Sequence, residues 1–97
     1  MSAYKVTLKA QDDLISIGRH TQKEWGVAQR NFYLKQLDNC FSQIADNPAL
    51  GMGCDLVATG YRKFPQASHI IFYKQNAKGT VEIIRVLHKS MDIESMF

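Results

Sequence analysis

The sequence predicts a single α+β domain in which a helical hairpin packs on an antiparallel sheet, with elements in the order β-α-α-β-β-β. Two amphipathic helical patterns fill the first half of the chain and are joined by one or two residues, so they should form a hairpin. Three runs rich in β-branched and aromatic residues follow, with the short connections of antiparallel strands. A chain of 97 residues leaves no room for a second core, so residues 1–97 are one domain.

The first predicted elements are a short strand and a helix. Residues 4–8 alternate apolar and polar side chains, as a strand does. Over residues 10–25, the spacing of three and four predicts one buried helical stripe made of Leu14, Ile17, Gly18, Thr21 and Trp25. Asp12 and Asp13 are expected in the first turn, where acidic groups suit the helix dipole, and Gly26 ends the helix.

A second helix is predicted over residues 28–45. Its buried side is expected to carry Tyr33, Leu34, Leu37, Cys40, Phe41 and Ile44. Asn47 ends this helix, because a residue that precedes a proline is disfavoured in the helical region, and Pro48 follows it. The next stretch, LGMGCDL at residues 50–56, is predicted to be a loop.

The three remaining strands are predicted at residues 60–64, 67–75 and 80–88, separated by Pro65-Gln66 and by a turn at residues 76–79. On a regular strand Arg85 and His88 point to opposite faces, which argues against a catalytic pair unless a bulge intervenes. Both faces of the last strand carry apolar residues, although the two helices cover only one. The other face needs cover from the C-terminal segment, from a second copy in a homodimer, or from a partner chain.

Composition excludes several classes of protein. No run of about 18 apolar residues is present, and the N-terminus lacks a signal peptide's apolar core, so we expect a cytoplasmic protein without a membrane span. Cys40 and Cys54 form no CxxC motif, and a structural disulfide is not expected in a reducing compartment. His20, His69 and His88 are far apart and have no partners at zinc spacing, so no metal site is predicted.

Positive charge is concentrated in the last third of the chain. The whole chain has a net charge of +3, and residues 56–91 contain only one acid, Glu82. The basic residues of that segment are Arg62, Lys63, Lys74, Lys78, Arg85 and Lys89. Such a region attracts nucleic acid or an acidic protein surface. A solvated face without a partner agrees equally well with the charge alone.

The element order resembles the RelE/ParE superfamily of bacterial toxins, and five stretches resemble its ParE branch. They span nearly the whole chain and are AQDDLISI, ADNPALG, GYRKF, SHIIFY and IIRVLHKSMD. The resemblance implies the toxin of a type II toxin–antitoxin system that poisons DNA gyrase by binding and so blocks replication. It also implies a ParD-like antitoxin that neutralises the toxin and binds operator DNA, so that nucleic acid is contacted only through the complex. Neither a cofactor nor catalytic residues are expected of such a toxin.

The RelE-like branch, whose members cut messenger RNA on the ribosome, is the alternative. Cleavage needs a base for the 2′-hydroxyl, an acid for the leaving oxygen and cations for the phosphorane charge. Arg62 and Arg85 would be the cations and His88 the acid or base. The C-terminal SMDIESMF carries neither the tyrosine nor the histidine that this branch often uses, so the set is incomplete. A third hypothesis is a toxin fold that only binds its antitoxin.

Two sets of contact residues follow for a gyrase poison. The target contacts are assigned to the basic strands and the apolar tail: Arg62, Lys63, Arg85, His88, Lys89, Met91, Ile93, Met96 and Phe97. The antitoxin contacts are assigned to the hairpin and the sheet: Leu14, Trp25, Tyr33, Leu37, Phe72, Tyr73 and Arg85. The basic region predicts that the antitoxin segment is acidic. The competing structural interpretation pairs Arg85 with Glu82 or a helix carboxylate, and we expect Trp25 to be a core residue at the end of its helix.

Overall fold

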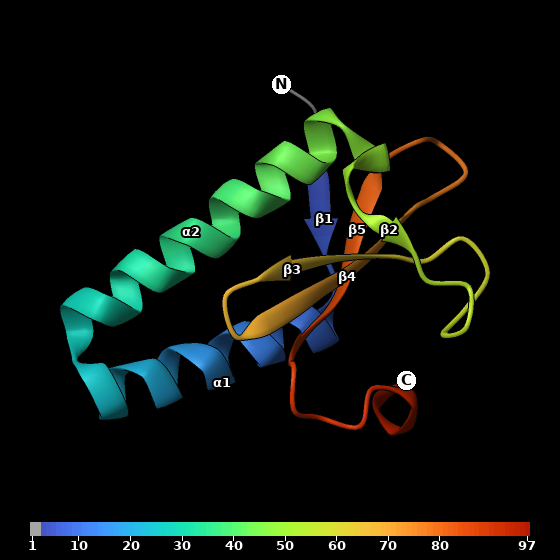
Figure 1. Ribbon diagram of the computed structural model, residues 1–97. Coiled ribbons are helices and arrows are strands. Elements are labelled where there is room, and N and C mark those ends of the chain that lie inside the picture. Colours follow the sequence, from blue (N-terminus) through green and yellow to red (C-terminus); the bar gives the residue numbers. More distant parts are fainter. Residues whose placement is uncertain (1–2) are drawn as a thin grey trace.

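The computed structural model describes residues 3–97, where two helices pack on one face of a five-stranded sheet (Figure 1). The elements are β1 (Tyr4–Val6), α1 (Leu8–Trp25), α2 (Val27–Asp46), β2 (Met52–Gly53), β3 (Arg62–Gln66), β4 (His69–Gln75) and β5 (Val81–His88). Short 3₁₀ helices follow α2 at Pro48–Leu50 and end the chain at Glu94–Met96. The predicted α+β class and the order of its elements are confirmed, and β2 is an additional strand that the sequence did not indicate.

The start of α1 differs from the prediction because Thr7 caps it. The Thr7 hydroxyl accepts a hydrogen bond from the Ala10 N–H at 3.1 Å and donates one to the Ile84 carbonyl at 2.9 Å. A side chain that satisfies a free N–H at the first turn fixes the beginning of a helix. The predicted strand was therefore two residues too long, and Asp12 and Asp13 lie beyond the first turn.

Gly26 joins the two helices in the left-handed region, with a φ of 91° that favours glycine. From this point α1 and α2 diverge, and the turn between β3 and β4 points into the angle between them (Figure 1). Trp25 lies beside Gly26 and is 74% exposed, so the prediction of a core residue was wrong. The helices have already separated from the sheet at this end, and Thr21 is the last residue of α1 that is buried.

The strands are ordered β1-β5-β4-β3-β2, which places the first and the last strand of the chain next to each other. β1 runs parallel to β5, whereas the other neighbours are antiparallel. The turn between β3 and β4 is at Ala67 and Ser68, and not at Pro65 as predicted. Pro65 can lie within β3 because β2 pairs only with Arg62 and Lys63, which leaves the rest of β3 at an edge, where a missing N–H is tolerated.

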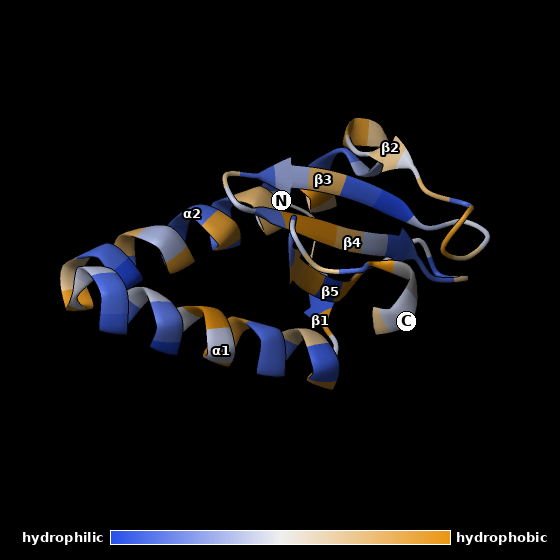
Figure 2. Ribbon diagram, turned by 60° about the horizontal axis from the view of Figure 1, so that its bottom comes forward, coloured by the Kyte–Doolittle hydropathy of each residue, from blue (hydrophilic) through white to orange (hydrophobic). Residues whose placement is uncertain are grey.

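An extra residue in β5 sorts its side chains between the two faces. Phe72 pairs with Arg85 but Tyr73 pairs with Ile83, so Ile84 is a bulge without a partner in β4. The bulge brings Ile83 and Val86 to the same side, where they join the core under the helices: Ala10, Ile17, Leu37, Cys40, Phe41, Ile44, Ile71, Tyr73 and Val81. Figure 2 shows the strongest apolar colouring along β4 and β5. In residues 3–97, no helix is both long and apolar enough to cross a membrane.

Candidate functional site

Arg85 makes its hydrogen bonds within the protein. Its Nε and Nη2 atoms donate hydrogen bonds to the two carboxylate oxygens of Asp13 in α1, both at 2.8 Å. Nη1 donates to the carbonyl of Met96 at 2.7 Å, and the two side chains of the ion pair are only 12% and 13% exposed. The hydrogen bond that Arg85 donates to the Asp13 carboxylate raises the pKa of Arg85. The structural interpretation, an arginine paired with a helix carboxylate, therefore describes this residue.

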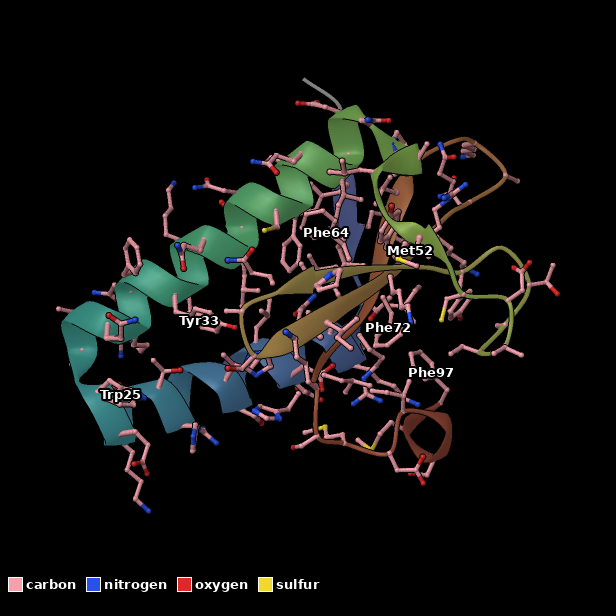
Figure 3. The ribbon with its side chains drawn as sticks, in the orientation of Figure 1. Trp25, Tyr33, Met52, Phe64, Phe72 and Phe97 are labelled. Atoms are coloured by element: carbon pink, nitrogen blue, oxygen red, sulfur yellow. The ribbon has the colours of Figure 1, made fainter. Side chains whose placement is uncertain are left out.

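The C-terminal segment folds back over the sheet face opposite the helices. The Phe97 ring packs edge-on against Phe72 at 5.1 Å and Tyr61 at 5.9 Å between centroids, and Figure 3 shows Phe97 directed toward Phe72. Phe72 and Leu87 are each 1% exposed on this face. The apolar surface that the helices leave open is thus covered by the chain itself. Met91 and Phe97 remain 43% and 42% exposed, and Ile93 and Met96 are partly buried.

The three residues assigned to the nuclease alternative do not form one site. Arg62 lies on the helix side of β3, where it pairs with Tyr73, whereas His88 pairs with His69 at the other end of the sheet. Four residues of β3 separate these two register positions, which corresponds to roughly 13 Å along a strand. Arg85 lies on the opposite face. One phosphate cannot be contacted by all three side chains in this arrangement.

Arg62 and Tyr73 instead hold the loop that follows α2. The Tyr73 hydroxyl accepts the Gly51 N–H at 2.7 Å and donates to the carbonyl of Pro48 at 2.7 Å. Nη1 of Arg62 donates to the Gly51 carbonyl, also at 2.7 Å. Burial raises the pKa of Tyr73, so its hydroxyl stays protonated as the donor to Pro48. The glycine in ADNPALG is therefore enclosed, because Tyr73 and Arg62 bind its two backbone groups.

The residues assigned to the antitoxin divide into interior and surface positions. Leu37, Phe72 and Tyr73 are at most 1% exposed, so they are not on the surface and offer an antitoxin no contact. The helical pattern had already placed Leu37 on the buried side of α2, whereas the strand pattern did not show that Phe72 and Tyr73 are interior. Leu14 and Tyr33 are partly buried, and Trp25 is exposed. Of the target residues, Lys89 is exposed and Lys63 is partly buried.

A groove between α1, α2 and the turn that joins β3 to β4 brings together the three histidines of the chain, a cluster that sequence spacing did not reveal. Two adjoining hollows of about 330 Å³ and 380 Å³ share His20 and Thr21 from α1 with His69 and His88 from β4 and β5. We call them the histidine groove; its other lining residues are Ser16, Ile17, Trp25, Gln29, Tyr33, Gln36, Ala67, Ser68, Ser90 and Met91. Figure 3 shows Trp25 and Tyr33 at the hairpin end. A prediction that β4 pairs with β5 could have placed His69 next to His88, because these two residues are opposite each other in the sheet.

The histidine rings in this groove are held by neutral hydrogen-bonding partners. Tyr33 Oη lies 2.6 Å from Nδ1 of His69, and the His69 and His88 rings meet edge to face at 5.3 Å. Nδ1 of His88 accepts the Ser90 N–H at 3.1 Å, so the ring proton of neutral His88 is on Nε2. Burial, aided by the charges of His88 and His20, lowers the pKa of His69 to about 4. Among the residues described, no group of three or more His, Cys, Asp or Glu side chains is placed to hold a metal ion.

The outer surface of the hairpin carries a third hollow and several exposed apolar side chains. This hollow of about 410 Å³ lies between α1 and α2 and is lined by Leu14, Ile15, Gly18, Arg19, Gln22, Arg30, Asn31 and Leu34. At the hairpin end, Val27 and Phe32 are 48% and 56% exposed beside Trp25. Such surfaces are common at sites of protein association.

Comparisons with known proteins agree with this fold. Residues 4–93 match the model of a family described as the ParE toxin of the type II toxin–antitoxin system parDE. Toxin ParE1 of Mycobacterium tuberculosis is 39% identical over 93 residues, which cover 96% of this chain and 95% of the relative. Toxin ParE1 of Caulobacter vibrioides is 36% identical, with coverage of 95% and 94%.

A solved structure titled as the chromosomal ParDE TA system from P. aeruginosa has the same fold. Its TM-score is 0.77 at 18% identity, and the match covers 91% of this chain and 96% of that one. The similarity in sequence extends from β1 to the C-terminal segment, so it includes the helices, the sheet and the region of Arg85. The chain belongs to the ParE toxin family of type II toxin–antitoxin systems.

Proposed function

We propose that this ParE toxin poisons DNA gyrase in the cytoplasm and is neutralised by a ParD-like antitoxin. The observation that carries the proposal is the similarity to toxins named ParE over residues 4–93, at up to 39% identity in the relatives compared above. An antitoxin partner follows from membership in a toxin–antitoxin family. Gyrase as the target, and action by binding, follow from the resemblance to the ParE branch.

The geometry supports binding over RNA cleavage. A ribonuclease needs a base, an acid and a cation within reach of one phosphodiester. Here Arg85 is occupied by Asp13 and Met96, Arg62 by Gly51, and His88 lies at the other end of the sheet. The residues that the nuclease alternative requires are thus separated from one another, and two of them are engaged in intramolecular contacts.

For the target, the proposed surface is the C-terminal segment and the basic residues near it. Met91 and Phe97 expose part of their apolar surface, and Lys89 is exposed at the end of β5. Lys74 adds positive charge, with Nζ 5.8 Å from the Tyr61 ring that also contacts Phe97. Partly exposed aromatic and methionine side chains are enriched at protein-binding surfaces, and the lysines beside them would attract an acidic target surface.

For the antitoxin, the proposed surface is the helical hairpin. The hollow between α1 and α2 has apolar walls at Leu14 and Leu34, with Arg19 and Arg30 at its rim. An amphipathic segment with acidic residues fits such a groove, because its apolar side meets the leucines and its carboxylates meet the arginines. Trp25 and Phe32 extend this surface to the hairpin end.

The test is a supercoiling assay with purified toxin, gyrase, ATP and relaxed plasmid. The expected result is loss of supercoiling with accumulation of protein-linked linear DNA. Neither effect should occur when the toxin is mixed with the antitoxin before gyrase is added. Unchanged gyrase activity at high toxin excess would contradict the proposed target. Codon-dependent cleavage of messenger RNA on ribosomes, lost in His88→Ala, would instead support the alternative. Normal growth of cells that express the toxin alone would indicate an inactive copy.

A further inference from the structure

We propose that the histidine groove binds a carboxylate side chain of an acidic partner segment, and that this contact becomes tighter as the pH falls. The inference rests on the proposed neutralisation by an antitoxin and adds a second contact, with its own chemistry, to the one proposed above at the hollow between α1 and α2. It depends on three features of the groove: its shape, the kinds of group that line it, and the state of its histidines in the free protein.

The groove has room for side chains of another protein and apolar walls to hold them. Its two hollows, of about 330 Å³ and 380 Å³, meet at the histidines, so they form one elongated depression. Trp25 stands at one end and Met91 at the other. A short peptide segment would place apolar side chains against these ends and a polar side chain at the centre.

The centre of the groove selects for a carboxylate. None of the described lining residues is Asp, Glu, Lys or Arg, so the ionisable side chains available to a ligand are the imidazoles and the Tyr33 phenol. A carboxylate that enters beside His69 can be paired as soon as one imidazole takes up a proton. Nucleic acid is a poorer match, because its row of phosphates requires permanent cations.

The titratable groups around His69 determine the sign of the pH effect. His20 and Asp13 face it from α1, Tyr33 contacts it from α2, and His88 faces it from β5. Cys40 of α2 is close to Tyr33, and burial raises the pKa of the Cys40 thiol, which therefore adds no charge near neutrality. Asp13 is already paired with Arg85 and Val86. Among the described groups that face His69, no free carboxylate therefore balances a charge on this ring in the free toxin, and the ligand would supply it.

Linkage gives the size of the effect. In the free toxin the pKa of His69 is about 4, so this ring is neutral above pH 5. A bound carboxylate that returns the pKa to its ordinary value near 6.5 makes binding take up a proton, and binding should be roughly fourfold tighter at about pH 6 than at about pH 8. All three histidines of the chain line the groove, so the toxin has no histidine elsewhere to produce this dependence.

The test is calorimetric titration of the full toxin with its ParD-like antitoxin, at about pH 6 and about pH 8, in buffers with different ionisation enthalpies. We expect tighter binding and proton uptake at the lower pH. The matched variant His69→Gln keeps a polar side chain but cannot be protonated, so it should bind without the fourfold change. Because an antitoxin can contain histidines of its own, the difference between wild type and variant is the decisive quantity.

A second readout needs no variant. The imidazole C–H resonances of the wild-type toxin, followed by NMR through a pH titration with and without antitoxin, should show the pKa of His69 rising on binding. Binding that is equally tight at both pH values, with unchanged histidine resonances, would overturn the inference while the proposed antitoxin function stands. If the antitoxin does not bind at all, both the proposed neutralisation and this inference are wrong. If short single-stranded RNA binds to the toxin more tightly at about pH 6 than at about pH 8, as is expected of the antitoxin, a carboxylate is the wrong choice of ligand.

Discussion

Asp13 and Arg85 are 72 residues apart in sequence and form a two-pronged ion pair that fastens α1 to β5. The same carboxylate accepts the Val86 N–H at 3.0 Å, at the edge of β5 that β1 leaves unpaired. Asp13 therefore accepts hydrogen bonds both from the Arg85 guanidinium and from a backbone N–H at the open edge of β5. Through Arg85 it also reaches the carbonyl of Met96, so that the start of α1, the bulged strand and the C-terminal segment are joined.

Removing one partner of this ion pair should destabilise the fold strongly. Asp13→Ala leaves a nearly buried guanidinium and the Val86 N–H unpaired, and we expect a loss of about 3 kcal/mol in the free energy of unfolding. Urea unfolding followed by circular dichroism measures this loss. Glu82→Ala is a suitable control, because Glu82 is the other carboxylate considered for Arg85 but lies away from the pair.

The double variant Asp13→Ala/Arg85→Ala tests whether the two residues act together. If they do, its cost should be clearly smaller than the sum of the two single costs, because the second change removes the charge that the first left unpaired. A loss below about 1 kcal/mol in each single variant would show that the pair is open to solvent, as exposed ion pairs are.

Gly51 should not tolerate a side chain. A Cβ atom at this position would be 2.5 Å from the hydroxyl oxygen of Tyr73 and 2.7 Å from the backbone carbonyl of Lys63, and neither contact is sterically possible. Gly51→Ala must therefore displace Tyr73 from its two hydrogen bonds, and we expect a loss of about 2 kcal/mol or more in thermal or urea unfolding. Gly53→Ala is the matched control, since nothing lies within 4 Å of its Cβ position. Equal stability of the two variants would contradict this account.

Periodicity and turn residues predicted the helices and the three main strands, but not the contacts between elements. Spacings of three and four located both helices, and Asn47 and Gly26 fixed their ends, because these signals are local. The bulge at Ile84 and the parallel pairing of β1 with β5 are absent from any local pattern, since they arise when distant strands meet. The spacing of apolar residues showed on which side of α1 Trp25 lies. It did not show that the sheet no longer covers that side of the helix beyond Thr21.

The candidate site was predicted less completely than the fold. Sequence reasoning gave Arg85 a structural interpretation with two possible partners, Glu82 or a helix carboxylate, and the structure identifies the partner as Asp13 in α1. His20, His69 and His88 were set aside as a metal site because they are far apart in sequence, and nothing in the sequence indicated that the pairing of β4 with β5 and the packing of α1 bring them into one groove. A cluster made by tertiary packing leaves no spacing signal.

Phe97 should matter more for the action on gyrase than for stability. Its ring is 42% exposed and packs on Phe72 and Tyr61, so Phe97→Ala should cost only about 1 kcal/mol of stability. If the tail contacts the target, the toxin concentration that halves supercoiling should rise at least about tenfold, which corresponds to about 1.4 kcal/mol of binding energy. Leu56→Ala removes a side chain that is 95% exposed and should change neither quantity. Truncation after Ser90 is less informative, because it would also uncover Phe72.

His69 should make the fold less stable in acid. Its pKa is about 4 in the folded protein and near 6.5 in the unfolded chain, so the unfolded state binds more protons between these values. The free energy of unfolding is therefore unaffected above about pH 7 and should fall as the pH drops from 6.5 toward 4. Because the ring is only half-buried, we expect a loss on the order of 1 to 2 kcal/mol from this residue.

The measurement is urea unfolding of the wild-type toxin and of His69→Gln across this pH range. Carboxylates also titrate below about pH 5, so the quantity to compare is the difference in slope between the two proteins. The variant should lose less stability than wild type between pH 6.5 and 4, even if it is less stable at neutral pH because it lacks the contact with Tyr33. Parallel curves for wild type and His69→Gln would mean that His69 takes up protons as readily in the folded state as in the unfolded one.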